Sequence, residues 1–387
     1  MKPIVPLLLF LIFILCGCAA HELQQFQQIA TADNPSKKIS EIMEKRGRQY
    51  AQNPDLFMAD LQSLKKRIAK YEKIIQSIWG KKDSKAPGTK RYVKYTDKYY
   101  SRAQIDFEKG VVVIETVAPN SQKERLRSAV VTTLLTPDDP RLVDLYSDSV
   151  PEITSTPFLY KQVLDHNGKP IKSKQQAKRY TDHLLKTKLQ QVKLGSQNGL
   201  RVVFSLVKDH RKLRAYKYAD IVRKYSAKYN IPESLTYAVI DTESSFNPFA
   251  VSSVPAYGLM QIVPSTAGRD VFEKVKHKKG QPSSQYLFDP ERNIEMGTAY
   301  LDLLQSRYLK NLTNKVSRRH AVVSAYNGGA GNVYKTFSKK QASAIKAINK
   351  LQPKQVYQIL IKKHPHSETR NYLVKVTKKE KEFHGNN

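Results

Sequence analysis

The pattern of apolar residues changes near Lys208, and this change constrains the fold more than any other feature of the chain. Before Lys208, short apolar runs typical of strands are mixed with helical stretches. After it, helices joined by polar loops continue to the C-terminus. A chain of 387 residues is long enough for two domains that each bury a core. The sequence therefore predicts an α+β protein, with a mixed domain at 57–207 and an all-helical domain at 208–387.

The mixed half carries signals for individual elements. Apolar residues recur at steps of three and four from Leu61 to Ile78, which predicts an amphipathic helix that ends near Gly80. Strands are expected at 91–95, 103–107, 111–117 and 201–207, a hairpin turn at 108–110, and further helices at 123–135 and 175–194. This half contains no arrangement of residues typical of a catalytic site.

The N-terminus has the parts of an export signal. Lys2 precedes an apolar run from Ile4 to Leu15, which is too short for a membrane span of about 20 residues. The following Cys16-Gly17-Cys18 resembles a bacterial lipoprotein processing site, with cleavage before Cys18 and acylation of its sulfur. We therefore expect a signal peptide at 1–17 and a lipidated tether at 18–56, and an uncleaved N-terminal anchor is the alternative. The absence of Asp after Cys18 favours the outer membrane.

The charge of the chain predicts a polyanionic partner. The formal net charge is +32, which would attract nucleic acid, anionic lipid or an acidic polymer of the bacterial envelope. Export argues against nucleic acid, because a periplasmic protein does not meet the chromosome. Residues 161–228 hold 18 Lys or Arg against 4 Asp, a local net charge of +14. This stretch is interpreted either as a solvated face or as a surface that faces the wall or a lipid.

A carboxylate on an apolar helix face is the first candidate for chemistry. Leu235 and Val239 line one face of a helix that begins near Pro232, and Glu243 continues this face. A carboxylate there is either part of a structural salt bridge or an acid whose pKa is raised by burial. Spacing alone favours the structural interpretation. Asp241 is expected on another part of the helix, in solvent.

Four short motifs favour a functional role for Glu243 over the structural one. They are Glu-Ser-Ser-Phe-Asn-Pro at 243–248, Gly-Leu-Met-Gln at 258–261, Ala-Tyr-Asn-Gly-Gly-Ala-Gly-Asn at 325–332, and Glu-Thr-Arg-Asn-Tyr at 368–372. In this order, across about 130 residues, they resemble the lytic transglycosylases that have a goose-lysozyme-like catalytic domain. Segments 92–97, 143–148 and 158–160 resemble the N-terminal domain of membrane-bound members of that family.

The resemblance implies cleavage of the β-1,4 bond between N-acetylmuramic acid and N-acetylglucosamine in peptidoglycan, with formation of 1,6-anhydromuramoyl ends. It implies that Glu243 is the one catalytic residue, acting first as acid and then as base. The residues implied in substrate binding are Ser244, Ser252, Gln261, Tyr326, Asn327 and Tyr372. Met260 is expected to pack beneath the site. No cofactor is implied, and the scattered His residues lack the spacing of metal ligands.

Three rival functions remain at this point. A true lysozyme would cut the same bond with water, but it needs a second carboxylate that the motifs do not supply. A catalytically inactive lipoprotein could tether the membrane to the wall, although Glu243 is intact. Nucleic-acid binding follows from the charge and conflicts with the export signal. The N-terminal domain is expected either to add contacts to the glycan strand or to orient the catalytic domain towards the wall.

Overall fold

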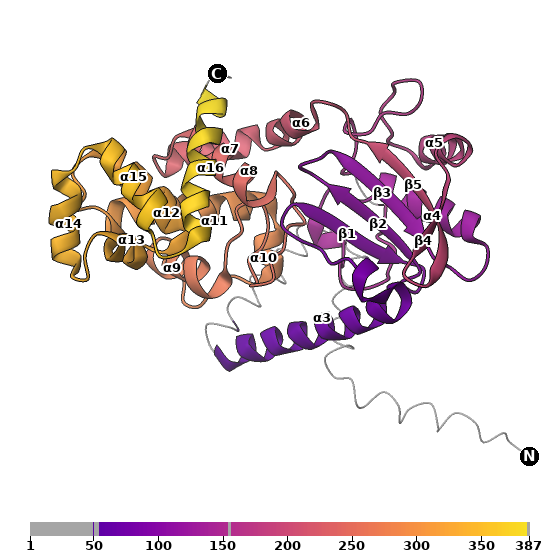
Figure 1. Cartoon of the computed structure of the whole chain (residues 1–387), viewed down its shortest axis with the longest axis horizontal. Helices are drawn as coiled ribbons and strands as arrows, with labels where there is room; N and C mark the ends of the chain where they lie inside the picture. Colours follow the sequence, from indigo (N-terminus) through magenta and orange to yellow (C-terminus); the bar gives the residue numbers. More distant parts are fainter. Residues whose placement is uncertain (1–48, 50–53, 154–155, 385–387) are drawn as a thin grey trace, which may run out of the picture.

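The computed structural model describes residue 49, residues 54–153 and residues 156–384 (Figure 1). The predicted signal peptide, Cys18 and most of the predicted tether lie outside the described residues. A sheet with flanking helices forms the N-terminal part of the described chain, and helices form the C-terminal part. This division confirms the predicted α+β class, with a mixed part followed by an all-helical part.

The sheet of the N-terminal part is antiparallel, in the order β1-β2-β3-β5-β4. Its strands are β1 Arg91–Thr96, β2 Ser101–Asp106, β3 Val111–Thr116, β4 Gln190–Leu194 and β5 Gln197–Ser205. The predicted hairpin turn joins β2 to β3, where the Gly110 N–H donates to the Asp106 carbonyl over 2.8 Å. Gly110 has a φ of +66°, and a Cβ there would lie 2.6 Å from the imidazole of His210. Glycine is therefore required by both the conformation and the close approach.

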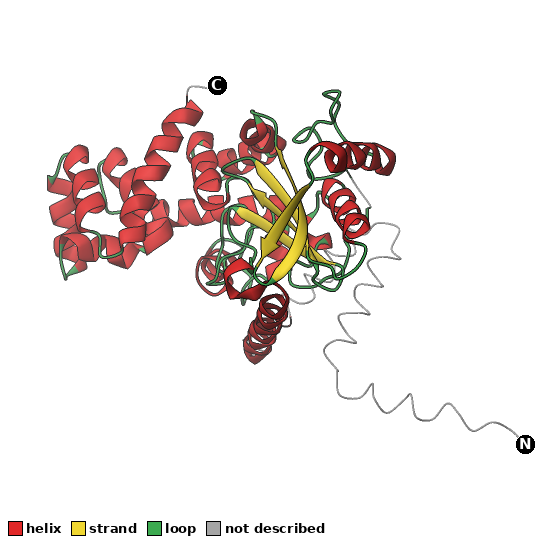
Figure 2. Ribbon diagram, turned by 45° about the vertical axis from the view of Figure 1, so that its right-hand side comes forward, coloured by secondary structure: helices red, strands yellow, loops and turns green. Residues whose placement is uncertain are grey.

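Helices cover both faces of the sheet (Figure 2). One face packs against α4 Gln122–Leu134 and α5 Lys174–Thr187, and the short helix η1 Pro140–Leu142 follows α4. The other face packs against the end of α3 Pro54–Asp83 through Tyr71 and Trp79. Successive strand residues point to opposite faces. In β1, accordingly, Tyr92 belongs to the first core and Val93 to the second.

One predicted element was wrong. The helix expected at 175–194 ends at Thr187, and Gln190–Leu194 forms the edge strand β4 instead. Gly195, with a φ of +61°, begins the turn into β5, which starts four residues earlier than predicted. A Cβ on Gly195 would lie 2.8 Å from the Trp79 carbonyl. The close approach of α3 and the pairing with β5 therefore override the helical pattern.

The regular elements of the C-terminal part are all helices, joined by loops, within its described residues. Its helices are α6 His210–Lys217, α7 Ala219–Lys228, α8 Glu233–Ser244, η2 Pro264–Gly268, α9 Arg269–Lys274, α10 Ser284–Phe288, α11 Pro290–Leu303, η3 Leu304–Tyr308, α12 Lys315–Gly328, α13 Ala330–Phe337, α14 Gln341–Lys350, α15 Pro353–Lys363 and α16 Ser367–His384. Helix α8 lies beside α16, which also packs on α12 (Figure 1). Nearly every residue of α8 is buried, so this helix forms the centre of the domain.

Candidate active site

Glu243 lies in the last turn of α8, next to the point where the helix ends. Leu235 and Val239 are fully buried on the same face, as the spacing predicted, while Glu243 is only partly buried. Ser245 and Phe246 both adopt a positive φ, of 51° and 59°, and they turn the chain sharply away from the helix axis. The carboxyl of Glu243 is therefore held at a helix end, where a substrate can reach it.

Burial raises the pKa of Glu243 to about 7. The nearby negative charge of Glu368 raises it further, whereas the Tyr372 hydroxyl and the positive charge of Lys90 lower it. A carboxylic acid with a pKa near 7 is protonated in a large fraction of molecules at neutral pH. This is the property that a general acid needs.

Two stacked tyrosines lie beside Glu243. The rings of Tyr326, from α12, and Tyr372, from α16, are parallel within 6°, with centroids 6.5 Å apart. The Tyr326 hydroxyl donates to the Met260 carbonyl over 2.8 Å. The Tyr372 hydroxyl is buried and lies near enough to the Glu243 carboxyl to lower the pKa of that carboxyl. Burial and the charge of Glu243 raise the pKa of both phenols well above the ordinary value, so both remain protonated donors.

The segment 258–261 forms the base of the site. Gly258 has a φ of +74°, and a Cβ there would lie 2.4 Å from the amide of Asn293. The buried Asn293 side chain accepts from the Met260 N–H over 2.7 Å and donates to the Tyr257 and Leu287 carbonyls. Gln261 leaves its Oε1 atom buried and without a partner among the described residues. Met260 is fully buried beneath the site, as predicted.

Asn293 therefore holds the shape of this segment, and sequence reasoning missed it. Asn293 has no motif of its own, since it is the fourth residue of α11 and looks like an ordinary polar residue of a helix. Only the structure reveals its role, because its side chain fills the space that the missing Cβ of Gly258 leaves open.

Asn327 is fixed by the motif on α16. The Thr369 hydroxyl donates to Asn327 Oδ1 over 2.6 Å, and Asn327 Nδ2 lies 3.4 Å from Glu368 Oε1. These two contacts set which end of the amide points to each neighbour. Gly328 allows α12 to approach α16, because a Cβ there would lie 2.6 Å from Thr369 Oγ1. Thr369 and Glu368 are thus further residues of the site whose role the motif alone did not reveal.

Two serines predicted to bind substrate have other contacts. Ser244 is fully buried, and its hydroxyl bonds to the Leu259 carbonyl over 2.8 Å and the Ile240 carbonyl over 3.0 Å. This hydroxyl ties α8 to the segment 258–261, and a substrate contact for Ser244 stays a prediction. Ser252 accepts from the Ala256 N–H over 3.1 Å and also bonds to the Val254 carbonyl. Ser252 is partly exposed, so a substrate contact there stays a prediction.

Asp241 is not in solvent, and this prediction was wrong. It is 1% exposed, and it forms ion pairs with Arg211 and with Lys379, whose Nζ lies 2.7 Å from Asp241 Oδ2. The helix turns Asp241 towards α6 and α16, where two cations compensate its charge. Asp241 is therefore a structural carboxylate, which removes it as a partner for Glu243.

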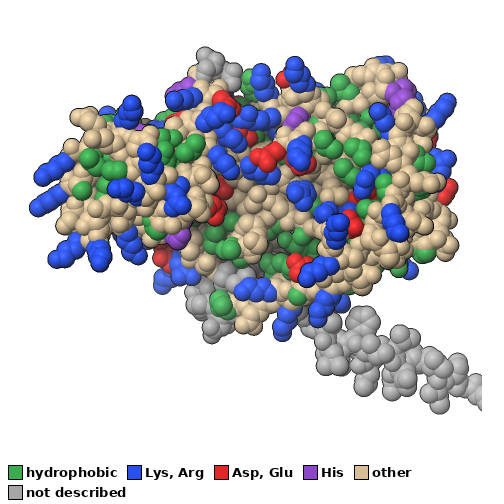
Figure 3. Space-filling model, in the orientation of Figure 1, with side chains coloured by type: hydrophobic (Ala, Val, Ile, Leu, Met, Phe, Trp, Pro, Cys, Tyr) green, Lys and Arg blue, Asp and Glu red, His purple; other side chains and the backbone are tan. Residues whose placement is uncertain are grey.

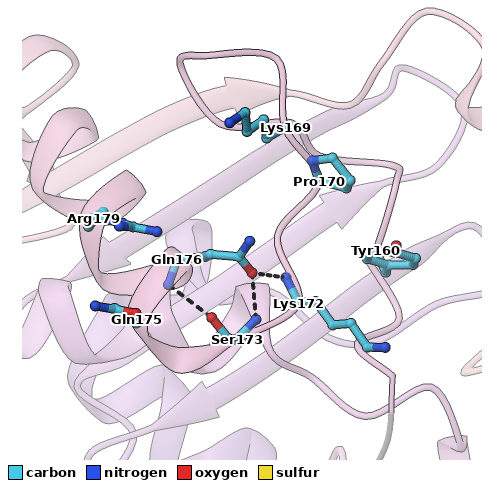
Figure 4. A pocket seen from close by; sticks show the side chains of 8 residues that line it. All are labelled: Tyr160, Lys169, Pro170, Lys172, Ser173, Gln175, Gln176 and Arg179. Atoms are coloured by element: carbon cyan, nitrogen blue, oxygen red, sulfur yellow. Dashed lines mark hydrogen bonds between the residues drawn. The ribbon is translucent and has the colours of Figure 1, made fainter.

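A second hollow lies in the N-terminal part, at the start of α5 (Figure 4). Its volume is about 750 Å³. Its lining residues are Tyr160, Lys169, Pro170, Lys172, Ser173, Gln175, Gln176 and Arg179. We call these eight residues the basic hollow, because three of them are cationic and none is acidic. Ser173 and Gln176 cap the helix reciprocally, which leaves the cationic side chains to face the hollow.

Within residues 54–153 and 156–384, no three His, Cys, Asp or Glu side chains lie close enough to hold a metal ion. Over the same ranges, no helix combines the length and the apolar character that crossing a membrane requires. Lys and Arg side chains are spread over the viewed face of both parts, with fewer acidic ones between them (Figure 3).

Comparison with known proteins gives matches along most of the chain. Residues 57–217 match the family "Membrane-bound lytic murein transglycosylase C, N-terminal domain", and residues 220–349 match "Transglycosylase SLT domain". Both matches agree with the resemblances seen in the motifs. They meet between residues 217 and 220, whereas the sequence pattern predicted a boundary near 208.

Curated relatives match over a similar length. Membrane-bound lytic murein transglycosylase C of Photorhabdus laumondii is 50% identical over 80% of this chain and 87% of its own length. The protein of the same name from Yersinia enterocolitica is 46% identical over 87% of this chain and 94% of its own length. Among solved structures, the 70 kDa soluble lytic transglycosylase of Escherichia coli is 31% identical over 42% of this chain and 23% of that chain, with a TM-score of 0.34. With both of its parts matched, the chain belongs to the family of membrane-bound lytic murein transglycosylase C.

Proposed function

We propose that this lytic transglycosylase cleaves the β-1,4 bond between N-acetylmuramic acid and N-acetylglucosamine in peptidoglycan without consuming water. One observation carries the proposal: the pKa of Glu243 is raised to about 7, and no described cation forms an ion pair with this carboxyl. Such a group can donate a proton and later accept one at the same pH. A nucleophile of the ordinary retaining type would instead have to be ionised from the start.

Glu243 performs two steps in this mechanism. It first gives its proton to the glycosidic oxygen, and the bond from that oxygen to C1 of the muramic acid breaks. The C6 hydroxyl of the same sugar then attacks C1, and its proton passes to the Glu243 carboxylate. A 1,6-anhydromuramoyl end results, Glu243 returns to its acid form, and no second carboxylate is required.

The neighbouring side chains have supporting roles in this proposal. The protonated hydroxyl of Tyr372 acts on the Glu243 carboxyl, so it can donate to the Glu243 carboxylate or to a sugar oxygen. Gln261 offers an acceptor that is equally unpartnered among the described residues. Asn327, oriented by Thr369, presents its amide to the reacting sugar. The stacked ring of Tyr326 keeps Tyr372 in place.

The membrane attachment is proposed from the N-terminal sequence and from the name of the relatives. A lipid on Cys18 would hold the enzyme on the periplasmic face of the outer membrane. Replacing Cys18 with Ala should release the protein into the soluble periplasmic fraction. An unchanged membrane fraction would instead support an uncleaved N-terminal anchor.

The experiment that tests the reaction uses protein starting after Cys18, incubated with purified peptidoglycan, with the products analysed by mass spectrometry. Wild type should give anhydromuramoyl ends, and Glu243→Gln should give none. Glu368→Gln is the matched control, because Glu368 is the other carboxylate whose charge acts on Glu243. Reducing muramic ends that disappear in Glu368→Gln would establish the lysozyme reaction instead. Binding without cleavage by wild type would support a tether.

The basic hollow is proposed to hold the acidic peptide stems of the wall. Three of its lining residues, Lys169, Lys172 and Arg179, are cationic and none is acidic, whereas peptide stems carry carboxylates. Changing all three to Gln should weaken sedimentation with insoluble peptidoglycan, most clearly at low salt. Changing Lys339, Lys346 and Lys350, at and around α14, to Gln is the charge-matched control. Equal weakening by both triples would mean that only net charge matters.

A further inference from the structure

The segment that follows Glu243 packs into the core of the N-terminal part. Phe249 is 1% exposed and belongs to the core beneath the sheet, although it lies only six residues after Glu243. Its ring meets those of Tyr92 and Phe158 edge-on, with centroids 5.1 and 5.2 Å away. Asn247 is fully buried and donates to the Thr89 carbonyl over 3.0 Å. The chain therefore leaves the catalytic helix directly into the other domain.

Arg214 joins three segments at this junction. It comes from α6, is 1% exposed, and donates to the Ser245 carbonyl over 3.2 Å. Its other donors reach the Phe107 carbonyl over 3.0 Å and Gln162 Oε1 over 3.0 Å, both in the N-terminal part. The guanidinium also lies 4.9 Å from the centre of the Phe107 ring. One side chain thus ties the residue two positions after Glu243 to the turn after β2 and to the loop that contains Gln162.

The chemistry of this contact requires arginine. Among the described residues, the hydrogen-bond acceptors of Arg214 are neutral, and its fourth contact is to His210 Nδ1 over 2.9 Å. Burial accordingly lowers the pKa of Arg214 to about 10. Burying a cation without a bonded carboxylate is costly in free energy, so each N–H group of the planar guanidinium needs an acceptor. A lysine ammonium is a point charge on a flexible stem and cannot span three segments in one plane.

We propose that Arg214 is a positioning residue for Glu243. Through Arg214, the N-terminal domain becomes a structural part of the active site. Arg214 fixes the Ser245 carbonyl, and the left-handed turn at Ser245 and Phe246 fixes the end of α8 on which Glu243 stands. Displacing a catalytic group by about 1 Å can cost roughly a hundredfold in rate. The inference rests on Glu243 being the acid of the proposed reaction.

The test compares two arginines that both link the domains. Arg141 bonds to Asp289 over 2.7 Å at the start of α11, and it does not contact the segment after Glu243. Arg214→Lys should lower kcat by about 10- to 100-fold with KM within about twofold, whereas Arg141→Lys should leave kcat within about twofold. Equal kcat losses in the two variants, measured on folded protein, would overturn the proposal.

The pH profile separates positioning from general destabilisation. Loosening the turn lets water reach Glu243, so the alkaline limb of kcat/KM, which reports the free enzyme, should move from near pH 7 towards lower pH in Arg214→Lys. Arg141→Lys should keep the wild-type profile. An unmoved limb in Arg214→Lys, even with a reduced kcat, would contradict the positioning role.

A milder variant keeps the test decisive if Arg214→Lys does not fold. Gln162→Met removes the acceptor on the N-terminal side and leaves α8 and the residues after it untouched. It should lower kcat about threefold to tenfold and shift the pH profile in the same direction, while a wild-type profile would overturn the proposal. Glu243→Gln is run in parallel: if that variant retains full activity, the proposed function fails, whatever the Arg214 variants do.

Discussion

Two buried or partly buried carboxylates, one in each part of the molecule, have opposite environments. Glu115 in β3 is 1% exposed and pairs with the buried Arg102 over 2.5 Å and with Arg201 over 2.5 Å. Arg102 in turn lies 4.1 Å from the centre of the Trp79 ring. Glu243 has tyrosines and amides around it instead. Burial alone does not make a functional carboxylate: Glu115 is held in two ion pairs, whereas Glu243 forms no ion pair among the described residues and has a raised pKa.

The largest difference between the two carboxylates should appear in activity. Glu243→Gln keeps the size of the side chain and removes its proton exchange, so peptidoglycan cleavage should fall about a thousandfold. Because the variant removes a titratable group from an apolar site, its melting temperature at pH 8 should be equal to or above that of wild type. Turnover is measured from released anhydromuropeptides and stability from thermal unfolding. Substantial residual turnover would mean that another group supplies the proton.

Glu115→Gln should give the reverse result. It leaves Arg102 buried without its carboxylate, and breaking a buried ion pair costs about 3 kcal/mol of unfolding free energy. The turnover per folded molecule should stay near that of wild type. Urea denaturation followed by circular dichroism provides the free energy, and the same preparation provides the activity. A stable but inactive Glu115→Gln variant would contradict the structural role of Glu115.

The pH dependence of stability should also distinguish Glu243. Its pKa rises from 4.5 in the unfolded chain to about 7 in the folded protein, so the folded state binds the proton more tightly. The resulting stabilisation is complete below about pH 4.5 and is lost as the pH rises through 7. Relative to Glu243→Gln, wild type should therefore lose roughly 2 kcal/mol between pH 4.5 and 8, allowing for partial exposure. A constant difference between the two proteins over this range would contradict the raised pKa.

The smallest expected effect concerns one hydroxyl. Tyr372→Phe keeps the stacking on Tyr326 and removes the donor that lowers the pKa of Glu243. The alkaline limb of the activity profile should move to higher pH, and kcat should fall about tenfold. Stability should change little, because phenylalanine fills the same space and only one hydroxyl is lost. Tyr300→Phe, whose ring meets Tyr326 from another direction at 5.6 Å, provides the control.

Sequence periodicity predicted the helices and strands that depend mainly on contacts between residues close together in the chain. The β2–β3 hairpin and the amphipathic α3 follow from periodicity and from one glycine at a turn. The edge strand β4 escaped prediction, although its partner β5 follows it directly, because Gly195 in the turn between them packs on Trp79, which is far away in the sequence. Asp241 was misplaced for the same reason, since its cations come from α6 and α16.

The residues of the candidate site also fall into those that the sequence predicted and those that it did not. Glu243, Tyr326 and Tyr372 were found because their motifs resemble those of a known family, and the structure brings them together. Asn293 and Arg214 were missed, because each acts through contacts between segments far apart in sequence. The resemblance also implied Ser244 in substrate binding; its hydroxyl bonds to the Leu259 carbonyl, and its contact with substrate stays a prediction.

The position of Phe249 in the N-terminal core has a consequence for biosynthesis. Chains emerge from the ribosome N-terminus first, and domains tend to fold in that order. The sheet and α4 can therefore be assembled before α8 appears, and Phe249 then packs onto their core. Tyr372 follows later, on α16. Glu243 acquires its buried surroundings only when both the sheet and α16 are in place, so a partly synthesised chain holds no complete site.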